Sequence, residues 1–105
     1  MAILNTPLST TNATTVFTAA AETAVTVIYL CNHSGGDAQV DVYCISDDGS
    51  TGASNDNIIY SNLQITTNDT YVISTEKLVL DTGDYLQVQA NVSGAVTVTV
   101  STMSI

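Results

Sequence analysis

Residues 25–31 read VTVIYLC, a stretch in which apolar side chains occupy both sets of alternating positions. A strand that is apolar on both faces is typical of the middle of a covered sheet. The next residues, NHSGGD at 32–37, have the composition of a turn. Residues 39–44, QVDVYC, then alternate polar and apolar side chains. We therefore expect a hairpin in which residues 25–31 form a central strand and residues 39–44 its partner.

Alternating segments recur along the rest of the chain, separated by turns at intervals of about 8 to 12 residues. The turn at residues 81–84, DTGD, offers Gly83 for a positive φ. Every second residue is apolar in 86–90 and 96–100, which places these positions in the core. The sequence thus predicts an all-β fold, a single β-sandwich or jelly roll of about eight short strands. The additional strands are expected at residues 15–18, 58–60, 63–65, 70–73, 78–80, 85–90 and 95–100.

The composition limits the partners that the chain can bind. Its 105 residues fit one domain, and ten Asp and Glu against a single cation, Lys77, give a net charge of −9. Binding to phosphates or to an anionic membrane surface needs several Lys or Arg. No stretch approaches the about 20 apolar residues that cross a bilayer. We therefore expect neither nucleic acid nor a membrane as a partner.

The first twelve residues differ from the rest of the chain. They contain the only proline, Pro7, and the apolar residues Ile3, Leu4 and Leu8 without a sustained period. This pattern predicts an extended N-terminal arm over residues 1–12, followed by a β-sandwich domain over residues 13–105.

The arm cannot form a core of its own, so its four named side chains are the candidate partner-binding residues. On that hypothesis, removal of residues 1–10 leaves the domain folded and weakens assembly. The alternative is that the arm lies along its own sandwich. The start also lacks the basic and apolar regions of a signal peptide, which favours synthesis in a cytoplasm.

His33 is the one side chain that ordinarily titrates near neutral pH. It lies in a glycine-rich turn, and its neighbour Ser34 cannot form a catalytic triad with it. An enzyme would need a carboxylate brought within reach of His33 by the fold. We expect an exposed turn histidine, no catalytic residue and no cofactor.

Cys31 and Cys44 are expected to remain unbridged. In the predicted hairpin Cys31 lies close to the turn and Cys44 several residues along the partner strand, at about 3.3 Å per residue. This separation exceeds what a disulfide spans.

Two other groups of residues suggest ligands. Asp47, Asp48 and Asp56 flank a polar loop, but the spacing of a calcium-binding loop is absent, so no metal site is expected. Five tyrosines lie in predicted strands, where an exposed cluster beside residues 46–57 would indicate a carbohydrate-binding module. These tyrosines are Tyr29, Tyr43, Tyr60, Tyr71 and Tyr85.

The order of the motifs resembles that of small virion structural proteins of tailed bacteriophages, particularly phages of marine cyanobacteria. The resemblance covers residues 14–101, although AAAET at residues 19–23 departs from the Pro-Ala-Gly-Lys-like turn of such proteins. The matching motifs are TTVFT at 14–18, LCNHS at 30–34, VDV at 40–42, GASNDNIIY at 52–60, NDTY at 68–71, LVLDTGD at 78–84 and VQA at 88–90.

The resemblance implies a non-enzymatic structural protein of the virion, made in the host cytoplasm. Its expected role is that of a capsid decoration protein, which stabilises the assembled head by binding it. Its expected partners are the major capsid protein or other virion proteins, in many copies or as a homo-oligomer. The alternatives are a tail, fibre or collar component and a carbohydrate-binding β-sandwich module.

Overall fold

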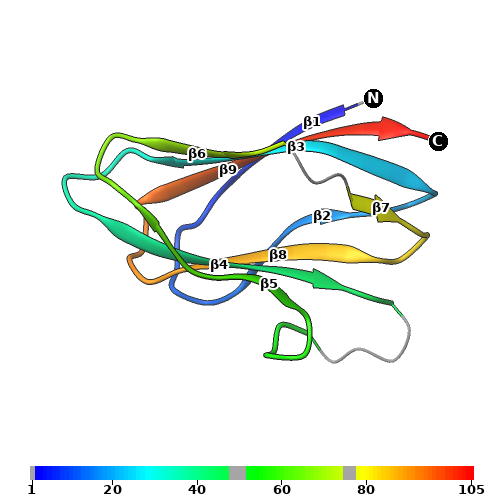
Figure 1. Cartoon of the computed structure of the whole chain (residues 1–105), viewed down its shortest axis with the longest axis horizontal. Helices are drawn as coiled ribbons and strands as arrows, with labels where there is room; N and C mark the ends of the chain where they lie inside the picture. Colours follow the sequence, from blue (N-terminus) through cyan, green and yellow to red (C-terminus); the bar gives the residue numbers. More distant parts are fainter. Residues whose placement is uncertain (1, 48–51, 75–77) are drawn as a thin grey trace.

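The computed structural model describes residues 2–47, 52–74 and 78–105, and these residues contain strands and no helix. They form two antiparallel sheets packed face to face (Figure 1). Sheet A has the strand order β1-β9-β3-β6, with β7 also paired to β3, and sheet B has the order β2-β8-β4-β5. The strands are β1 (Ala2–Pro7), β2 (Thr14–Thr18), β3 (Thr23–Asn32), β4 (Ala38–Ile45), β5 (Ile58–Ile65), β6 (Thr70–Ile73), β7 (Leu78–Leu80), β8 (Tyr85–Ala90) and β9 (Val96–Ser104).

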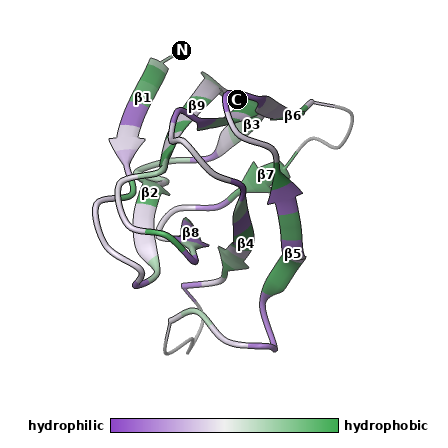
Figure 2. Cartoon of the chain, turned by 90° about the vertical axis from the view of Figure 1, so that its left-hand side faces the viewer, coloured by the Kyte–Doolittle hydropathy of each residue, from purple (hydrophilic) through white to green (hydrophobic). Residues whose placement is uncertain are grey.

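The pairing of the strands is nested. The first strand pairs with the last, β2 with β8, β3 with β6, and β4 with β5. The chain therefore resembles one long hairpin rolled into two layers, which is the wrapping of a jelly roll. Viewed from the end, sheet A lies above sheet B (Figure 2). The predicted all-β sandwich is confirmed.

Strand β3 is central, as its two apolar faces predict. It pairs with β9 along its length on one side and with β6 and β7 on the other. The predicted core positions of β8 and β9 are also confirmed, because alternate residues of both strands are buried. The core at the interface of the two sheets includes Leu30, Val40, Leu86 and Val98, all with no exposed surface.

The predicted hairpin of residues 25–31 and 39–44 is wrong. Strand β3 belongs to sheet A and β4 to sheet B, so residues 33–37 cross between the layers. Asn32 holds this crossing. Its side chain is fully buried and bonds Ser34, the Gly36 carbonyl and the Ile65 carbonyl. A crossing needs the same turn-forming residues as a hairpin, and for this reason the composition does not distinguish them.

The N-terminal segment is extended, as predicted, but it is not a separate arm. Residues 2–7 form β1 and pair with β9 from Ala2 opposite Thr102 to Pro7 opposite Thr97. Leu8 has no exposed surface, and its backbone bonds Val96 and Gly94. The division into an arm over residues 1–12 and a domain over 13–105 is therefore corrected, because a jelly roll needs its first strand to pair with its last. The two ends of the chain lie close together in Figure 1.

Both cysteines are free, in agreement with the sequence prediction, but for a different reason. Cys31 lies in sheet A opposite Thr97, whereas Cys44 lies in sheet B opposite Leu86 and packs against the core. The two thiols are thus separated by the layering of the sandwich and not by their distances from a shared turn.

Burial, followed by the nearby charge of Asp84, raises the pKa of the Cys44 thiol. Because the thiolate is the form that reacts, we expect iodoacetamide to alkylate Cys44 of the folded protein more slowly at neutral pH than Cys44 of the urea-unfolded chain. The rate for the folded protein should also begin to rise at a higher pH. Peptide mapping over a pH series measures both rates. Identical pH profiles for the two states would contradict the burial of Cys44.

The turn between β7 and β8 needs its glycine. Gly83 has a φ of 92°, and a Cβ added to it would lie 2.6 Å from Cγ of Asp47. We expect Gly83→Ala to lower the free energy of unfolding by about 1 to 3 kcal/mol, as measured in urea. Gly36→Ala is the control, since its added Cβ meets nothing within 4 Å. Equal stabilities of the two variants would contradict the close approach of Asp47.

Candidate functional site

His33 lies immediately after β3 and is exposed. Its Nε2 is 3.1 Å from the hydroxyl of Thr97, and its backbone N–H donates to the Ala95 carbonyl. In the described ranges no hydrogen bond or ion pair joins its ring to a carboxylate. The ring thus contacts a hydroxyl, but none of the described carboxylates is bonded to it in the way that orients the histidine of a catalytic triad.

The acidic residues that flank the polar loop do not converge either. Asp48 lies outside the described residues. The backbone N–H of Asp47 donates to a carboxylate oxygen of Asp84, and that of Asp56 donates to the Ser54 hydroxyl. Across the described ranges, no three His, Cys, Asp or Glu side chains gather in a way that could hold a metal ion.

The tyrosines do not form the exposed cluster that a stacking platform beside residues 46–57 would need. The two that are exposed, Tyr29 and Tyr71, lie in β3 and β6 of sheet A. Tyr43 is buried, while Tyr60 and Tyr85 are half-buried. Burial, the charge of Asp41 and a hydrogen bond to that carboxylate raise the pKa of Tyr43. Its hydroxyl thus remains a hydrogen-bond donor at neutral pH.

One surface stands out on the outside of sheet A, and we name it the sheet A face. It consists of side chains that alternate with the buried residues of each strand, so they point away from the core. The strand register arranges them in rows across the sheet. The rows are Met103, Ala24 and Val79; Ile3, Ser101 and Val27; Asn5, Thr99, Tyr29 and Val72; and Pro7, Thr97, Cys31 and Thr70.

The sheet A face contains no charged side chain, and it exposes several large apolar ones. Val79 is 67% exposed and Ile3 is 70% exposed. Tyr29, Val72 and Met103 are each exposed by more than two fifths of their surface. Several exposed apolar side chains on one uncharged face of a sheet are typical of interaction surfaces in soluble proteins.

The acidic residues lie elsewhere. The structure describes all of them except Asp48 and Glu76, and of those described only Asp41 lies in a strand. That strand is β4 of sheet B, and the others lie in the turns and loops. The sheet A face is thus uncharged, while acidic residues lie at the ends of its strands, among them Glu22 before β3 and Asp69 before β6. Lys77, the single cation, also lies outside the described residues.

The four candidate partner-binding residues are divided by the alternation of β1. Ile3 and Pro7 belong to the sheet A face, where a partner can reach them. Leu4 pairs with Val100, on the side of the core, and Leu8 is fully buried. Partner binding by Ile3 and Pro7 stays a prediction, whereas the sequence missed that Leu4 and Leu8 face the protein's own core.

The sequence alone indicates only a small part of the sheet A face. The available signal was in residues 97–103, TVTVSTM, where the positions that alternate with the core valines carry no charge. The full extent of the sheet A face depends on the register of the strands, because four strands besides β9 contribute to it.

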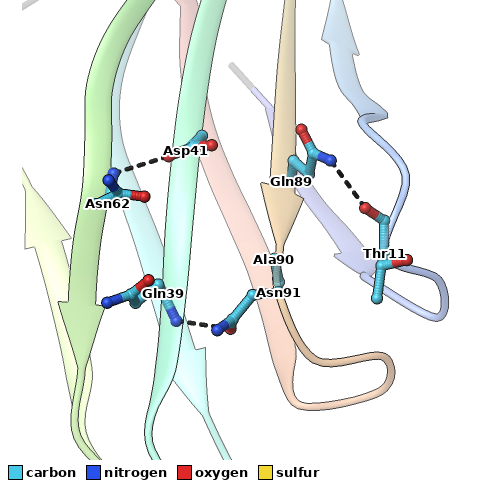
Figure 3. Close-up of a pocket in the computed structure, with 7 residues that line it drawn as sticks. All are labelled: Thr11, Gln39, Asp41, Asn62, Gln89, Ala90 and Asn91. Atoms are coloured by element: carbon cyan, nitrogen blue, oxygen red, sulfur yellow. Dashed lines mark hydrogen bonds between the residues drawn. The ribbon is translucent and has the colours of Figure 1, made fainter.

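The opposite side of the sandwich carries a polar groove on the outside of sheet B (Figure 3). It is open to solvent and has a volume of about 260 Å³. Strands β4, β5 and β8 and the segment before β2 contribute to it. The groove is lined by Thr11, Gln39, Asp41, Asn62, Gln89, Ala90 and Asn91.

A β-bulge shapes one wall of this groove. Two residues of β5, Ser61 and Asn62, oppose the single residue Asp41 of β4. Asn62 adopts a φ of 54°, which few residues other than glycine adopt, and its N–H donates to Asp41 over 2.7 Å. Residues 58–60 and 63–65 were expected as two strands, but they form the single strand β5 around this bulge.

No helix in the described ranges has the length and apolar character needed to cross a membrane. Comparisons with protein families, with curated proteins and with solved structures find no match to this chain. The two outer faces of the sandwich are therefore the features from which a function can be inferred.

Proposed function

We propose that the protein is a non-enzymatic capsid decoration protein of a tailed bacteriophage, which docks on the assembled head through the sheet A face. The observation that carries the proposal is the contrast between this uncharged, partly apolar face and the acidic turns and loops around it. The proposal also draws on the motif order described above. The expected partner is the major capsid protein, bound in many copies.

The free edge of sheet A supports the same docking mode. Strand β1 is an edge strand, and its sequence AILNTP contains no charge to discourage pairing with another chain. A strand of a capsid subunit can therefore add to this edge, where main-chain hydrogen bonds supply affinity and Ile3 supplies an apolar contact. Pro7, which lacks a backbone donor, marks the end of the region that can pair.

Decoration stabilises a particle by mass action. A protein that binds the assembled lattice and not its separate subunits lowers the free energy of the assembled state. Neither chemistry nor a cofactor is needed for this role. The jelly-roll fold is found in viral capsid and lectin domains, but this analogy is at the level of the fold alone and does not choose between roles.

A charge placed on the sheet A face tests the proposal. Val72 is 46% exposed in this face, and Val92 is 41% exposed in the turn between β8 and β9. We expect Val72→Asp to weaken binding to purified heads by about 30-fold, because the carboxylate loses its water in the interface. Val92→Asp, the matched control, should change the affinity by less than about twofold.

Binding is measured by co-sedimentation of labelled protein with heads from which the protein has been removed. Circular dichroism first checks that both variants are folded. Equal binding by the two variants would contradict docking through the sheet A face. Binding to tails and not to heads would replace the decoration role with that of a tail component.

A further inference from the structure

We infer that the groove on sheet B is a binding site for a neutral saccharide. The site lies on the opposite side of the sandwich from the sheet A face, so a docked protein would present it to solvent. The inference goes beyond the proposed function and is independent of it, since a sugar can be tested on the isolated protein.

The groove offers both donors and acceptors of hydrogen bonds. Its lining combines four side-chain amides, one carboxylate and a threonine. Sugar hydroxyl groups both donate and accept, and amide and carboxylate side chains complement them in both roles. Ala90 is the only apolar residue of the lining, which disfavours an apolar ligand.

Hydrogen bonds orient the polar groups before any ligand arrives. Asn91 accepts the N–H of Gln39 at 2.8 Å through its Oδ1, so its Nδ2 is the atom that can donate to a ligand. The Gln89 amide donates to the Thr11 carbonyl at 2.9 Å and accepts the Tyr43 hydroxyl at 3.2 Å. Figure 3 shows Gln39, Gln89, Asn91 and Thr11 around the groove. A preorganised site loses less entropy when its ligand binds.

The strained backbone at Asn62 is a second and independent observation. A left-handed conformation is uncommon outside glycine, although asparagine adopts it more readily than most residues, and it often occurs at functional sites. Here the bulge lets the Asn62 N–H donate to the Asp41 carboxylate, and this bond fixes the carboxylate in place. The remaining lone pairs of the Asp41 carboxylate can accept hydrogen bonds from the hydroxyl groups of a ligand. Bulges often re-aim side chains beside binding sites.

Charge excludes other ligand classes. Asp41 and the net charge of −9 repel phosphates, sulfates and uronic acids. One carboxylate is too few for a metal ion, and no cluster of three suitable ligands occurs among the described residues. A volume of about 260 Å³ lies just below the range for drug-sized ligands, which suits a single sugar ring.

The experiment is a titration of the full-length, ¹⁵N-labelled protein with methyl glycosides of glucose, mannose and galactose, followed by NMR. We expect at least one glycoside to shift the amide signals of Asn62, Gln89 and Asn91 in a saturable manner. Glucuronate and inorganic phosphate should not shift them. If no glycoside shifts these signals, or if glucuronate shifts them equally, the inference is wrong.

Two variants test the location of the site. The side chain of Gln39 lines the groove, while its hydrogen bonds to the rest of the protein involve its backbone. Gln39→Ala should therefore weaken binding about fivefold, the value of one hydrogen bond, without unfolding the protein. Gln64→Ala is the matched control, because Gln64 pairs with Gln39 in the sheet but lies outside the groove lining. Equal affinity of both variants would place the sugar elsewhere and overturn the inference.

Discussion

Removal of residues 1–8 is expected to unfold the protein. These residues supply β1, which pairs with six residues of β9, and Leu8, whose side chain is completely buried. Truncation of one buried leucine to alanine costs about 2 to 5 kcal/mol, while a whole domain is stable by about 5 to 15 kcal/mol. Loss of the strand and of Leu8 together should therefore remove most of the stability.

The measurement is circular dichroism combined with urea denaturation. The truncated chain should show neither the β-sheet spectrum nor a cooperative transition. Leu8→Ala should remain folded and be destabilised by about 3 kcal/mol, whereas Ile3→Ser, at a 70% exposed position, should change stability by less than about 0.5 kcal/mol. A truncated protein that unfolds cooperatively near the native urea midpoint would restore the separate arm predicted from the sequence.

Replacement of Asn32 is expected to have the second largest effect. Its Nδ2 donates to the Gly36 and Ile65 carbonyls, each at 2.9 Å, and its Oδ1 accepts the Ser34 N–H at 3.0 Å. The side chain thus connects the end of β3 to the crossing and to the end of β5. We expect Asn32→Ala to lower the free energy of unfolding by about 3 kcal/mol, because the buried Ile65 carbonyl loses its partner and two part-buried bonds, to Ser34 and Gly36, are lost with it.

The matched control is Asn55→Ala, at an exposed turn position, for which we expect a change of less than about 0.5 kcal/mol. Urea denaturation measures both variants. A loss below about 1 kcal/mol for Asn32→Ala would show that water replaces the bonds of Asn32 and that the crossing does not depend on it.

Asn32→Asp adds a pH dependence with a definite sign. The substitution would place a carboxylate against two carbonyl oxygens, and burial would raise its pKa above the value in the unfolded chain. An acid with a raised pKa destabilises the folded state increasingly as pH rises above its unfolded value of about 4. The deficit of this variant relative to the native protein should therefore grow between about pH 4 and neutral pH. A deficit independent of pH would show that the site is open to water.

The sequence contains the positions of the strands but not all of their partners. Alternation identifies the buried residues of β8 and β9, and apolar character on both faces identifies β3 as central. These signals are local, because side chains point alternately to the two faces of any strand. Which strand pairs with which is set by contacts between distant parts of the chain. For this reason the crossing at residues 33–37 was mistaken for a hairpin.

Strand β1 was missed for a related reason. Its inward positions are Ala2, Leu4 and Thr6, and only one of these is a large apolar residue. The strand is specified chiefly by its pairing with β9 at the other end of the chain. No property of the first twelve residues alone indicates that partner.

The candidate sites, like the strand pairing, could be predicted only in part from the sequence. The absence of charge on the sheet A face can be read in part from β9, but its width depends on the register of five strands. The groove on sheet B could not be predicted, since it joins Thr11 to Asn91 and depends on the bulge at Asn62. A bulge has no reliable signature in a single sequence when its positive φ falls on an asparagine.

The most direct test of the proposed function is cryo-electron microscopy of virions purified from infected host cultures. We expect the sandwich at regularly repeated positions on the head, with the sheet A face against the capsid and the groove of sheet B toward solvent. Absence of the protein from the head, or its presence there with the sheet A face turned toward solvent, would contradict the proposed function.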